Sequence, residues 1–204
     1  MQTTLNNHRC EKLLLAVFAL PVLVDVLQLI CTGFGFESKP YLAILWRCSE
    51  LALFILLART GLKRKAVVGC SLVIIGQILC LSYLSFQYLL SKELLNVLSG
   101  LLLGLSGLLH FIGLVMFATA LDVKKSLKVV ALISFVAFPV IFTICQIGID
   151  VWIVNSGLPR ESIPDVYTEY MAYYEIAGDV LDVAVLVAGV ICSGIFSKKQ
   201  VAEA

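Results

Sequence analysis

Six long apolar runs limit what this chain can fold into more than any other feature. They are Leu13–Phe34, Tyr41–Thr60, Ala66–Leu90, Leu94–Leu121, Val129–Val154 and Tyr173–Phe196. A helix needs about 20 apolar residues to cross the hydrocarbon core of a bilayer. The runs are continuously apolar rather than alternating, which favours helices over the strands of a membrane barrel. The sequence therefore predicts an all-α, polytopic integral membrane protein, with six transmembrane helices forming a single domain over residues 1–204.

Composition agrees with this class of protein and argues against a nucleic-acid partner. Of the 204 residues, 60% are hydrophobic and only 14% are charged, whereas soluble domains carry about 25% charged residues. The net charge is +1, and nucleic-acid binding needs a concentrated basic face. The lipid bilayer is the expected surrounding.

The basic residues predict how the six spans are oriented. Eleven lie at one end of the spans and three at the other, Lys39, Lys92 and Arg160. The eleven are Arg9, Lys12, Arg59, Lys63, Arg64, Lys65, Lys124, Lys125, Lys128, Lys198 and Lys199. Because cytoplasmic loops carry an excess of Lys and Arg, both termini are expected in the cytoplasm, at a bacterial inner membrane. The loop Asn155–Ala172 then faces outward.

Ionisable residues within the runs point to function, because charges inside a bilayer are costly and usually face a bundle interior or water. In the sixth span, Glu175, Asp179 and Asp182 follow the spacing i, i+4, i+7 and share one helix face. Leu186, Gly189 and Ser193 continue that face. Three carboxylates so close cannot all be charged cheaply, so a proton or a cation is expected among them.

The first and fifth spans carry matching polar patterns. Pro21 is followed by Asp25, Gln28 and Thr32, and Pro139 is followed at the same offsets by Thr143, Gln146 and Asp150. The match hints at duplicated hairpins, formed by spans one and two and by spans five and six. A proline within a span also favours a kink that frees a backbone carbonyl.

The second span contributes Arg47 and Glu50, three residues apart. They either form an ion pair within the helix, or Arg47 lies opposite Asp25 or the carboxylates of the sixth span. With a rise of about 1.5 Å per residue, most of these polar residues fall in the outer half of the membrane and Asp25 lies near mid-depth. We expect one outward-facing polar cavity as the solute or ion site, lined by Asp25, Gln28, Arg47, Glu50, Gln146, Asp150, Glu175, Asp179 and Asp182. The alternative is that these residues form structural polar contacts between helices.

The fourth span carries a face of small residues. Gly100, Gly104 and Gly107 lie on one side and include a G-x-x-x-G pattern, which is typical of close helix packing within a bundle or between protomers. A homo- or hetero-oligomer through this helix is therefore expected. His110 lies on an adjacent face, where a structural hydrogen bond is a more common role than ligand binding.

No catalytic motif, metal site or cofactor is predicted. Gly104–Gly107 resembles the G-x-S-G of rhomboid proteases, but the histidine which that family needs on its last core helix is missing. Zinc sites need three or four ligands, and the chain has two histidines. Cys31 and Cys145 lie toward the same ends of their spans, which leaves a disulfide between them open.

The leading functional hypothesis is a membrane protein that binds and transports a small polar or cationic solute. A cation or proton would bind at Asp179 and Asp182, and Asp25 would relay or gate. Two alternatives remain open. One is an intramembrane acid/base enzyme acting on a lipid or peptide through Asp25 and a carboxylate of the sixth span. The other is a non-catalytic partner subunit that docks through the glycine face of the fourth span.

Overall fold

The computed structural model describes residues 2–34, 39–60, 62–86, 92–157 and 163–194, and the elements in these ranges are all helices. They are α1 (Gln2–Gly33), α2 (Lys39–Ala58), α3 (Arg64–Phe86), α4 (Lys92–Ala120), α5 (Lys125–Leu132), the π-helical turn η1 (Ile133–Ala137), α6 (Phe138–Asn155) and α7 (Ile163–Ser193). Segments α5, η1 and α6 follow one another without a break. Within the described residues there are thus six helices long and apolar enough to cross a membrane.

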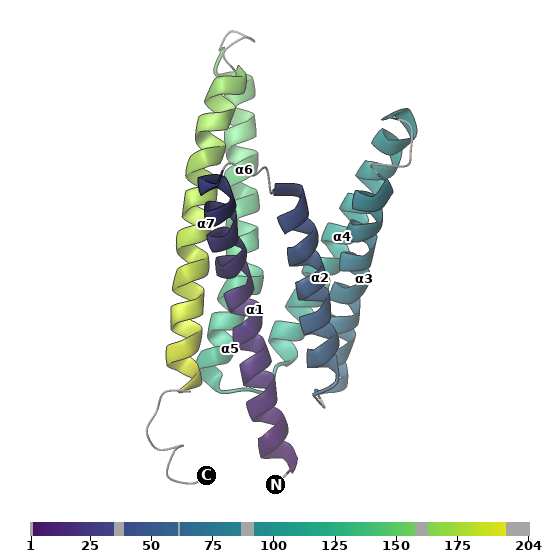
Figure 1. Ribbon diagram of the computed structural model, residues 1–204, viewed down its shortest axis with the longest axis vertical. Helices are drawn as coiled ribbons and strands as arrows, with labels where there is room; N and C mark the ends of the chain where they lie inside the picture. Colours follow the sequence, from purple (N-terminus) through teal and green to yellow (C-terminus); the bar gives the residue numbers. More distant parts are fainter. Residues whose placement is uncertain (1, 35–38, 61, 87–91, 158–162, 195–204) are drawn as a thin grey trace.

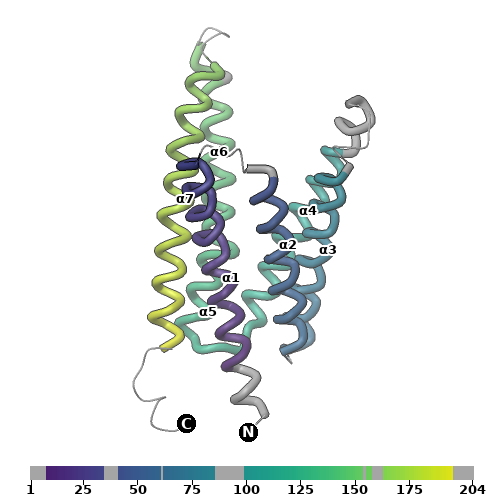
Figure 2. The backbone as a smooth tube through the Cα atoms, viewed as in Figure 1, coloured from purple at the N-terminus to yellow at the C-terminus, as the bar shows by residue number. Residues whose placement is uncertain are grey.

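The helices form two groups that lie side by side (Figure 1). Helices α2, α3 and α4 make one group, in which α3 and α4 pack against each other most extensively. Helices α1, α6 and α7 make the other, and α1 contacts both α2 and α7. The start of α1 and the end of α7 lie at the same end of the molecule, and the two groups separate toward the opposite end (Figure 2).

Basic side chains tie the helix ends together at the end where α1 starts. Lys63 lies 3.1 Å from Asp122, which links the segment before α3 to the one after α4. The amino group of Lys124 donates to the backbone carbonyl of Ser193 at the end of α7. The basic residues predicted to share one side of the membrane, as far as they are described, therefore do lie at one end of the bundle.

The tightly packed core lies toward this basic end. A row of phenylalanine rings crosses it, from Phe18 of α1 to Phe135 of η1 at 5.6 Å, then to Phe117 of α4 at 6.2 Å and to Phe54 of α2 at 5.4 Å. Val185 of α7 is buried in the same cluster. The described residues at this end are closed by apolar packing, and the large cavity lies farther along the helices.

Two helix starts differ from the sequence prediction. Helix α1 begins at Gln2, well before the expected Leu13, and α7 begins at Ile163, inside the expected loop Asn155–Ala172. The α7 start has a local cause, because Pro164 and Asp165 occupy its first turn. A backbone N–H in the first turn has no partner within the helix, so proline, which has no N–H, is tolerated there. The helix dipole favours a carboxylate at the same place. The expected ends of the third and sixth spans, at Leu90 and Phe196, lie outside the described residues.

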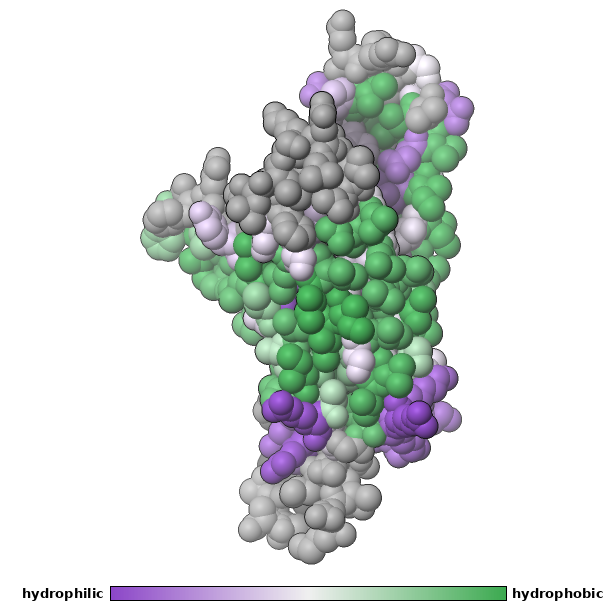
Figure 3. All heavy atoms as spheres, turned by 90° about the vertical axis from the view of Figure 1, so that its right-hand side faces the viewer, coloured by the Kyte–Doolittle hydropathy of each residue, from purple (hydrophilic) through white to green (hydrophobic). Residues whose placement is uncertain are grey.

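The outer surface of the helices is strongly apolar. Large hydrophobic side chains are exposed on every span-length helix, including Leu101 at 64% and Ile191 at 73%. The face over α3 and α4 is apolar across its middle, with hydrophilic residues gathered toward the basic end (Figure 3). Six such apolar helices suggest an integral membrane protein.

Candidate functional site

A large cavity of about 1130 Å³ lies between α1, α2, η1, α6 and α7. Its polar and charged lining residues are Asp25, Gln28, Thr32, Arg47, Ser134, Thr143, Glu175, Asp179 and Asp182. Trp46, Phe138, Phe142 and Tyr174 supply aromatic surface. The site therefore combines four carboxyl groups, one guanidinium group and several aromatic rings, drawn from separate helices.

Six of the nine residues predicted to bind a solute or ion line this cavity. They are Asp25, Gln28, Arg47, Glu175, Asp179 and Asp182. The carboxyl groups of Asp25 and Asp179 both lie close enough to Asp182 to act on it electrostatically. The aspartates of α1 and α7 thus converge on one space rather than pointing to separate neighbours.

The i, i+4, i+7 spacing on α7 produces a gradient of burial along the cavity wall. Glu175 and Asp179 are exposed, Asp182 is half-buried, and Gly189 farther along packs against the ring of Phe18. The face predicted to be acidic near one surface and uncharged farther in is therefore the face that α7 turns toward α1 and the cavity.

A π-helical turn next to the cavity explains how the fifth span bends. Proline has no N–H to donate, and its ring collides with the carbonyl group four residues earlier. The turn η1 ends directly before the pair Phe138–Pro139, and the N–H of Phe138 bonds to the carbonyl of Ile133, five residues back. Such turns occur often at functional sites. Here the turn brings Ser134 and the start of α6 to the cavity wall.

Aromatic side chains line the cavity beside the carboxyl groups, and the sequence reasoning did not single them out. The rings of Phe142 and Tyr174 meet edge to face at 4.7 Å, joining α6 to α7. The guanidinium carbon of Arg47 lies 5.6 Å from the ring centre of Trp46. Aromatic faces attract cations, so these rings add to the attraction that the carboxyl groups exert on a positively charged group.

Gln146 and Asp150 lie outside the cavity, although they were predicted to line it. The amide nitrogen of Gln146 donates to Asp150 at 3.2 Å and to the hydroxyl of Tyr167 at 3.1 Å. The reason is geometric, because α6 and α7 extend beyond the end of α1 and the start of α2 (Figure 1). Beyond those ends, neither α1 nor α2 continues opposite them to complete a cavity wall, and Gln146 bonds to Asp150 and to Tyr167 of α7.

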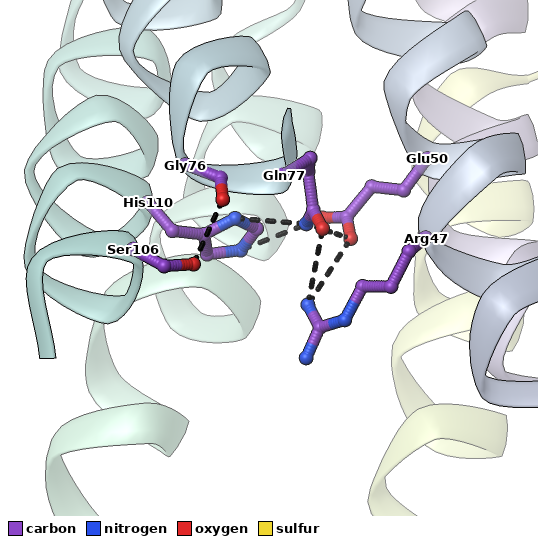
Figure 4. Close-up of polar contacts among 6 residues, drawn as sticks. All are labelled: Arg47, Glu50, Gly76, Gln77, Ser106 and His110. Atoms are coloured by element: carbon purple, nitrogen blue, oxygen red, sulfur yellow. Dashed lines mark hydrogen bonds and ion pairs between the residues drawn. The ribbon is translucent and has the colours of Figure 1, made fainter. Parts of the chain in front are cut away.

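Glu50 also departs from the predicted arrangement, because it belongs to a buried network between α2, α3 and α4 (Figure 4). Its carboxylate lies 3.8 Å from Arg47 on the same helix. It also accepts a 2.5 Å hydrogen bond from the amide nitrogen of Gln77 and lies 3.4 Å from Nε2 of His110. The ion pair within α2 is therefore present, and Arg47 lines the cavity at the same time.

The directions of these hydrogen bonds follow from what each group can donate. The amide nitrogen of Gln77 contacts Glu50 and, at 3.0 Å, Nδ1 of His110. An amide NH₂ only donates, so Nδ1 accepts and the imidazole proton resides on Nε2, facing the carboxylate. The carbonyl oxygen of Gln77 accepts from Arg47 at 3.4 Å. Every member of the network therefore has a partner of the right kind.

Glu50 lines a second, smaller space of about 130 Å³. Trp46, Asp182, Phe18 and Phe135 line it as well. Trp46, Ser134 and Asp182 also line the larger cavity. The small space is therefore adjacent to the larger cavity, and Glu50 of α2 and Asp182 of α7 both line it.

Gln77 is the member of this network that sequence reasoning missed. It is 1% exposed and sits at the centre of the contacts with Arg47, Glu50 and His110. A signal was present, since a lone amide in the middle of an apolar run usually bonds to a neighbouring helix. The prediction that His110 makes a structural hydrogen bond agrees with its contact to Gln77.

The glycine face of α4 is open, and other glycines pack the helices. A methyl group placed on Gly100, Gly104 or Gly107 would meet nothing within 4 Å. In contrast, one on Gly69 of α3 would lie 2.7 Å from the carbonyl oxygen of Gly113 on α4. Among the described residues, α3 approaches α4 through Gly113, on another face of the helix from the predicted one.

Cys31 and Cys145 are free thiols. Among the described residues, no group of three or more His, Cys, Asp or Glu side chains is arranged to hold a metal ion. No protein-family model, curated protein or solved structure matches this chain. Fold and site therefore define it only by class, as an all-helical protein whose described residues include six helices of membrane-spanning length and an acidic, aromatic-lined cavity between some of them.

Proposed function

We propose that the chain is an integral membrane protein that binds and transports a small polar or cationic solute. The six span-length helices and their apolar outer surface support insertion in a bilayer. The basic end would face the cytoplasm, following the usual excess of Lys and Arg on that side. The acidic cavity would then open toward the outside, because it lies at the other end of the bundle from the basic loops and the phenylalanine row.

The observation that carries this proposal is the convergence of Asp25, Asp179 and Asp182 on one cavity. Carboxyl groups at membrane depth are costly unless water, a cation or a proton compensates them. Four carboxyl groups line the space against the single guanidinium of Arg47, so a cation that enters would be attracted by uncompensated negative charge. Glu175 and Asp179 would receive the solute first, and Asp182 and Asp25 would bind it deeper.

The test is uptake into liposomes that contain the purified protein. Sodium, potassium, choline and putrescine would be offered as probe cations, with protein-free liposomes as the blank. We expect at least one cation to be taken up. Asp182→Asn should reduce that uptake by about tenfold or more, because loss of one partner from a desolvated charge pair costs at least about 2 kcal/mol.

The matched control is Asp165→Asn, which removes a carboxylate in the first turn of α7, an exposed position outside the cavity lining. Its uptake should equal that of the unmodified protein. Equal uptake by the Asp182→Asn variant, or no uptake of any probe by the folded protein, would contradict the proposal.

One observation favours a second candidate, an intramembrane acid/base enzyme. Asp25 and Asp182 come from different helices, line the same cavity and act on one another electrostatically, and an acid/base pair of carboxyl groups likewise comes from separate parts of a chain. Incubating the reconstituted protein with its lipids and analysing them by mass spectrometry separates the two candidates. A new lipid product that is lost in Asp182→Asn supports the enzyme, and an unchanged lipid pattern together with uptake supports the transporter.

A further inference from the structure

The buried network around Glu50 shares one residue, Arg47, with the acidic cavity. Arg47 makes two kinds of contact within the network, an ion pair with Glu50 and a hydrogen bond to the carbonyl oxygen of Gln77. Its side chain is nevertheless 36% exposed and lines the cavity that holds Asp179 and Asp182. Among the described lining residues, Arg47 thus contributes the one guanidinium group of the cavity, and a buried glutamate is its ion-pair partner.

From this geometry we propose that Glu50 is a proton-binding site that controls the cation affinity of the acidic cavity through Arg47. The inference rests on the proposed function and deepens it, since it names the proton as the coupling ion. When Glu50 is ionised, Arg47 is neutralised within the network, and the cavity keeps its full negative charge for a cation. When Glu50 binds a proton, Arg47 loses its counter-charge and turns to the carboxylates, where it competes with the cation.

The hydrogen-bond pattern explains why a single proton has this effect. Oxygen Oε2 of Glu50 accepts from the amide nitrogen of Gln77, so a proton on that oxygen would face a group that can only donate. The amide must turn to present its oxygen to Glu50 and to Nδ1 of His110, and the imidazole proton then resides on Nδ1 so that this nitrogen donates to the amide oxygen. Its NH₂ group then faces Arg47, which has lost both the acceptor and the negative charge that held it.

The proton has a route to Glu50 that does not disturb the apolar floor. The small cavity of about 130 Å³ is lined by both Glu50 and Asp182, and an ordered water needs only about 10–15 Å³. Water there can relay a proton: its oxygen accepts one from the solution in the acidic cavity as it gives another to the carboxylate, and the reverse transfer occurs when the site ionises. Phe18 and Phe135 also line this space and offer the water no polar partner.

All titratable or charged groups that face Glu50 can be named element by element. On α2 there is Arg47, on α4 there is His110, and on α7 there is Asp182 across the small cavity. Helix α3 contributes the neutral amide of Gln77, and α1 and η1 contribute Pro21, Ser134 and apolar side chains. A cation bound at Asp182 would lie across the small cavity from Glu50 and repel a proton there, so the cation and the proton should compete.

Trp46 provides a local reporter, because it lines the cavity and contacts Arg47. The chain has two tryptophans, and Trp152→Phe leaves Trp46 as the only one. The quenching constant of its fluorescence is measured with caesium, which is a cation, and with acrylamide, which is neutral. The first constant is divided by the second. This ratio measures the local negative charge independently of access, and it is recorded from about pH 4 to pH 9, where carboxyl and imidazole groups titrate.

We expect the ratio to fall by about threefold to tenfold as pH falls through a Glu50-dependent step, since a unit charge at this range changes the local cation concentration by that order. Glu50→Gln should give the low ratio at every pH, and Glu50→Asp should retain the step. If Glu50→Gln fails to fold, Arg47→Gln, which changes a partly exposed side chain, provides the second test. The ratio for Arg47→Gln should stay high through that step.

A step that is identical in the unmodified protein and in Glu50→Gln, or that persists in Arg47→Gln, overturns the inference. Uptake that depends on Asp182 but is accompanied by no Glu50-dependent step overturns the inference alone and leaves the proposed transport function standing.

Discussion

At the scale of single residues, Gln77 illustrates how one neutral side chain can organise several charged ones. Its amide offers donors on one side and an acceptor on the other, and in the structure the donors meet Glu50 and His110 while the acceptor meets Arg47. No other uncharged side chain provides both at this length. Gln77 is therefore expected to contribute more to stability than its own hydrogen bonds suggest, because it satisfies three partners on two other helices.

Replacing Gln77 with leucine tests this expectation. The apolar side chain fills similar space but leaves Glu50 and His110 without their shared donor, and each buried group left unsatisfied costs about 1–3 kcal/mol. We expect the free energy of unfolding, measured by denaturant titration in detergent, to fall accordingly. Gln146→Leu is the matched control at a partly exposed position on α6, with an expected change within about 0.5 kcal/mol. Equal effects of the two substitutions would show that the network around Gln77 does not stabilise the fold.

Spacing along one helix predicted the acidic wall but not its neighbours. Glu175, Asp179 and Asp182 could be placed together because a helix puts i, i+4 and i+7 on one face. Whether Glu50 met α7 or α3 could not be decided in this way, since the answer depends on how the second span is rotated in the bundle. That rotation is set by packing of residues such as Phe54, which the sequence presents as one more apolar side chain among many.

At the scale of helices, glycines decide how closely α3 and α4 approach. A methyl group on Gly69 would lie 2.6 Å from the backbone nitrogen of Phe117, and backbone atoms cannot rotate away as a side-chain tip can. Gly69→Ala should therefore push the helices apart and lower the free energy of unfolding by about 1–3 kcal/mol. Thermal or denaturant unfolding of the purified protein measures this.

Gly104→Ala is the control for that substitution, because its methyl group meets nothing within 4 Å. Alanine is favoured over glycine in a helix by about 0.5–1 kcal/mol, so this variant should be unchanged or slightly more stable. Destabilisation by Gly104→Ala together with tolerance of Gly69→Ala would contradict the packing described for α3 and α4.

The helix positions were largely predictable, but the choice of packing faces was not. Continuous apolar runs indicated all six span-length helices, since a span of hydrocarbon fixes their length. The G-x-x-x-G pattern of α4 drew attention to Gly100 and Gly104, yet α3 packs against Gly113. Glycines on two faces of one helix are equivalent in sequence, and only the surface of the partner helix distinguishes them. Similarly, Pro139 predicted a disturbance of the regular helix. Whether the helix accommodates the proline with a kink or with the π turn η1 depends on the surrounding helices.

At the scale of the whole molecule, the cavity exists because the bundle is packed at one end and divided at the other. The buried cluster joins α1, α2, α3, α4, α5, η1 and α7 near the basic end, while the two helix groups separate away from it (Figure 2). Asp25, Arg47 and Asp179 lie beyond the phenylalanine row on their own helices. The same division that provides space for a solute also provides two bodies that could move relative to each other, which the proposed transport would require.

The proposed capture of a solute from outside requires the open end to face away from the cytoplasm, so orientation is the prediction that belongs to the whole chain. Single cysteines are introduced into a variant whose seven native cysteines are replaced by serine or alanine. Lys125→Cys lies at the basic end, at the start of α5, and Asp165→Cys lies at the other end, in the first turn of α7. A maleimide that cannot cross membranes is applied to intact bacterial cells that produce the protein.

Because positively charged loops remain in the cytoplasm, the reagent should label Asp165→Cys in intact cells and Lys125→Cys only after the membrane is permeabilised. Permeabilised cells provide the control for the reactivity of both thiols. The reverse pattern would place the acidic cavity on the cytoplasmic side, and the proposed capture of a solute from outside would be wrong even if the cavity binds cations. Labelling of both positions in intact cells would contradict the membrane-spanning arrangement itself, since α5, η1 and α6 would then not cross the bilayer between them.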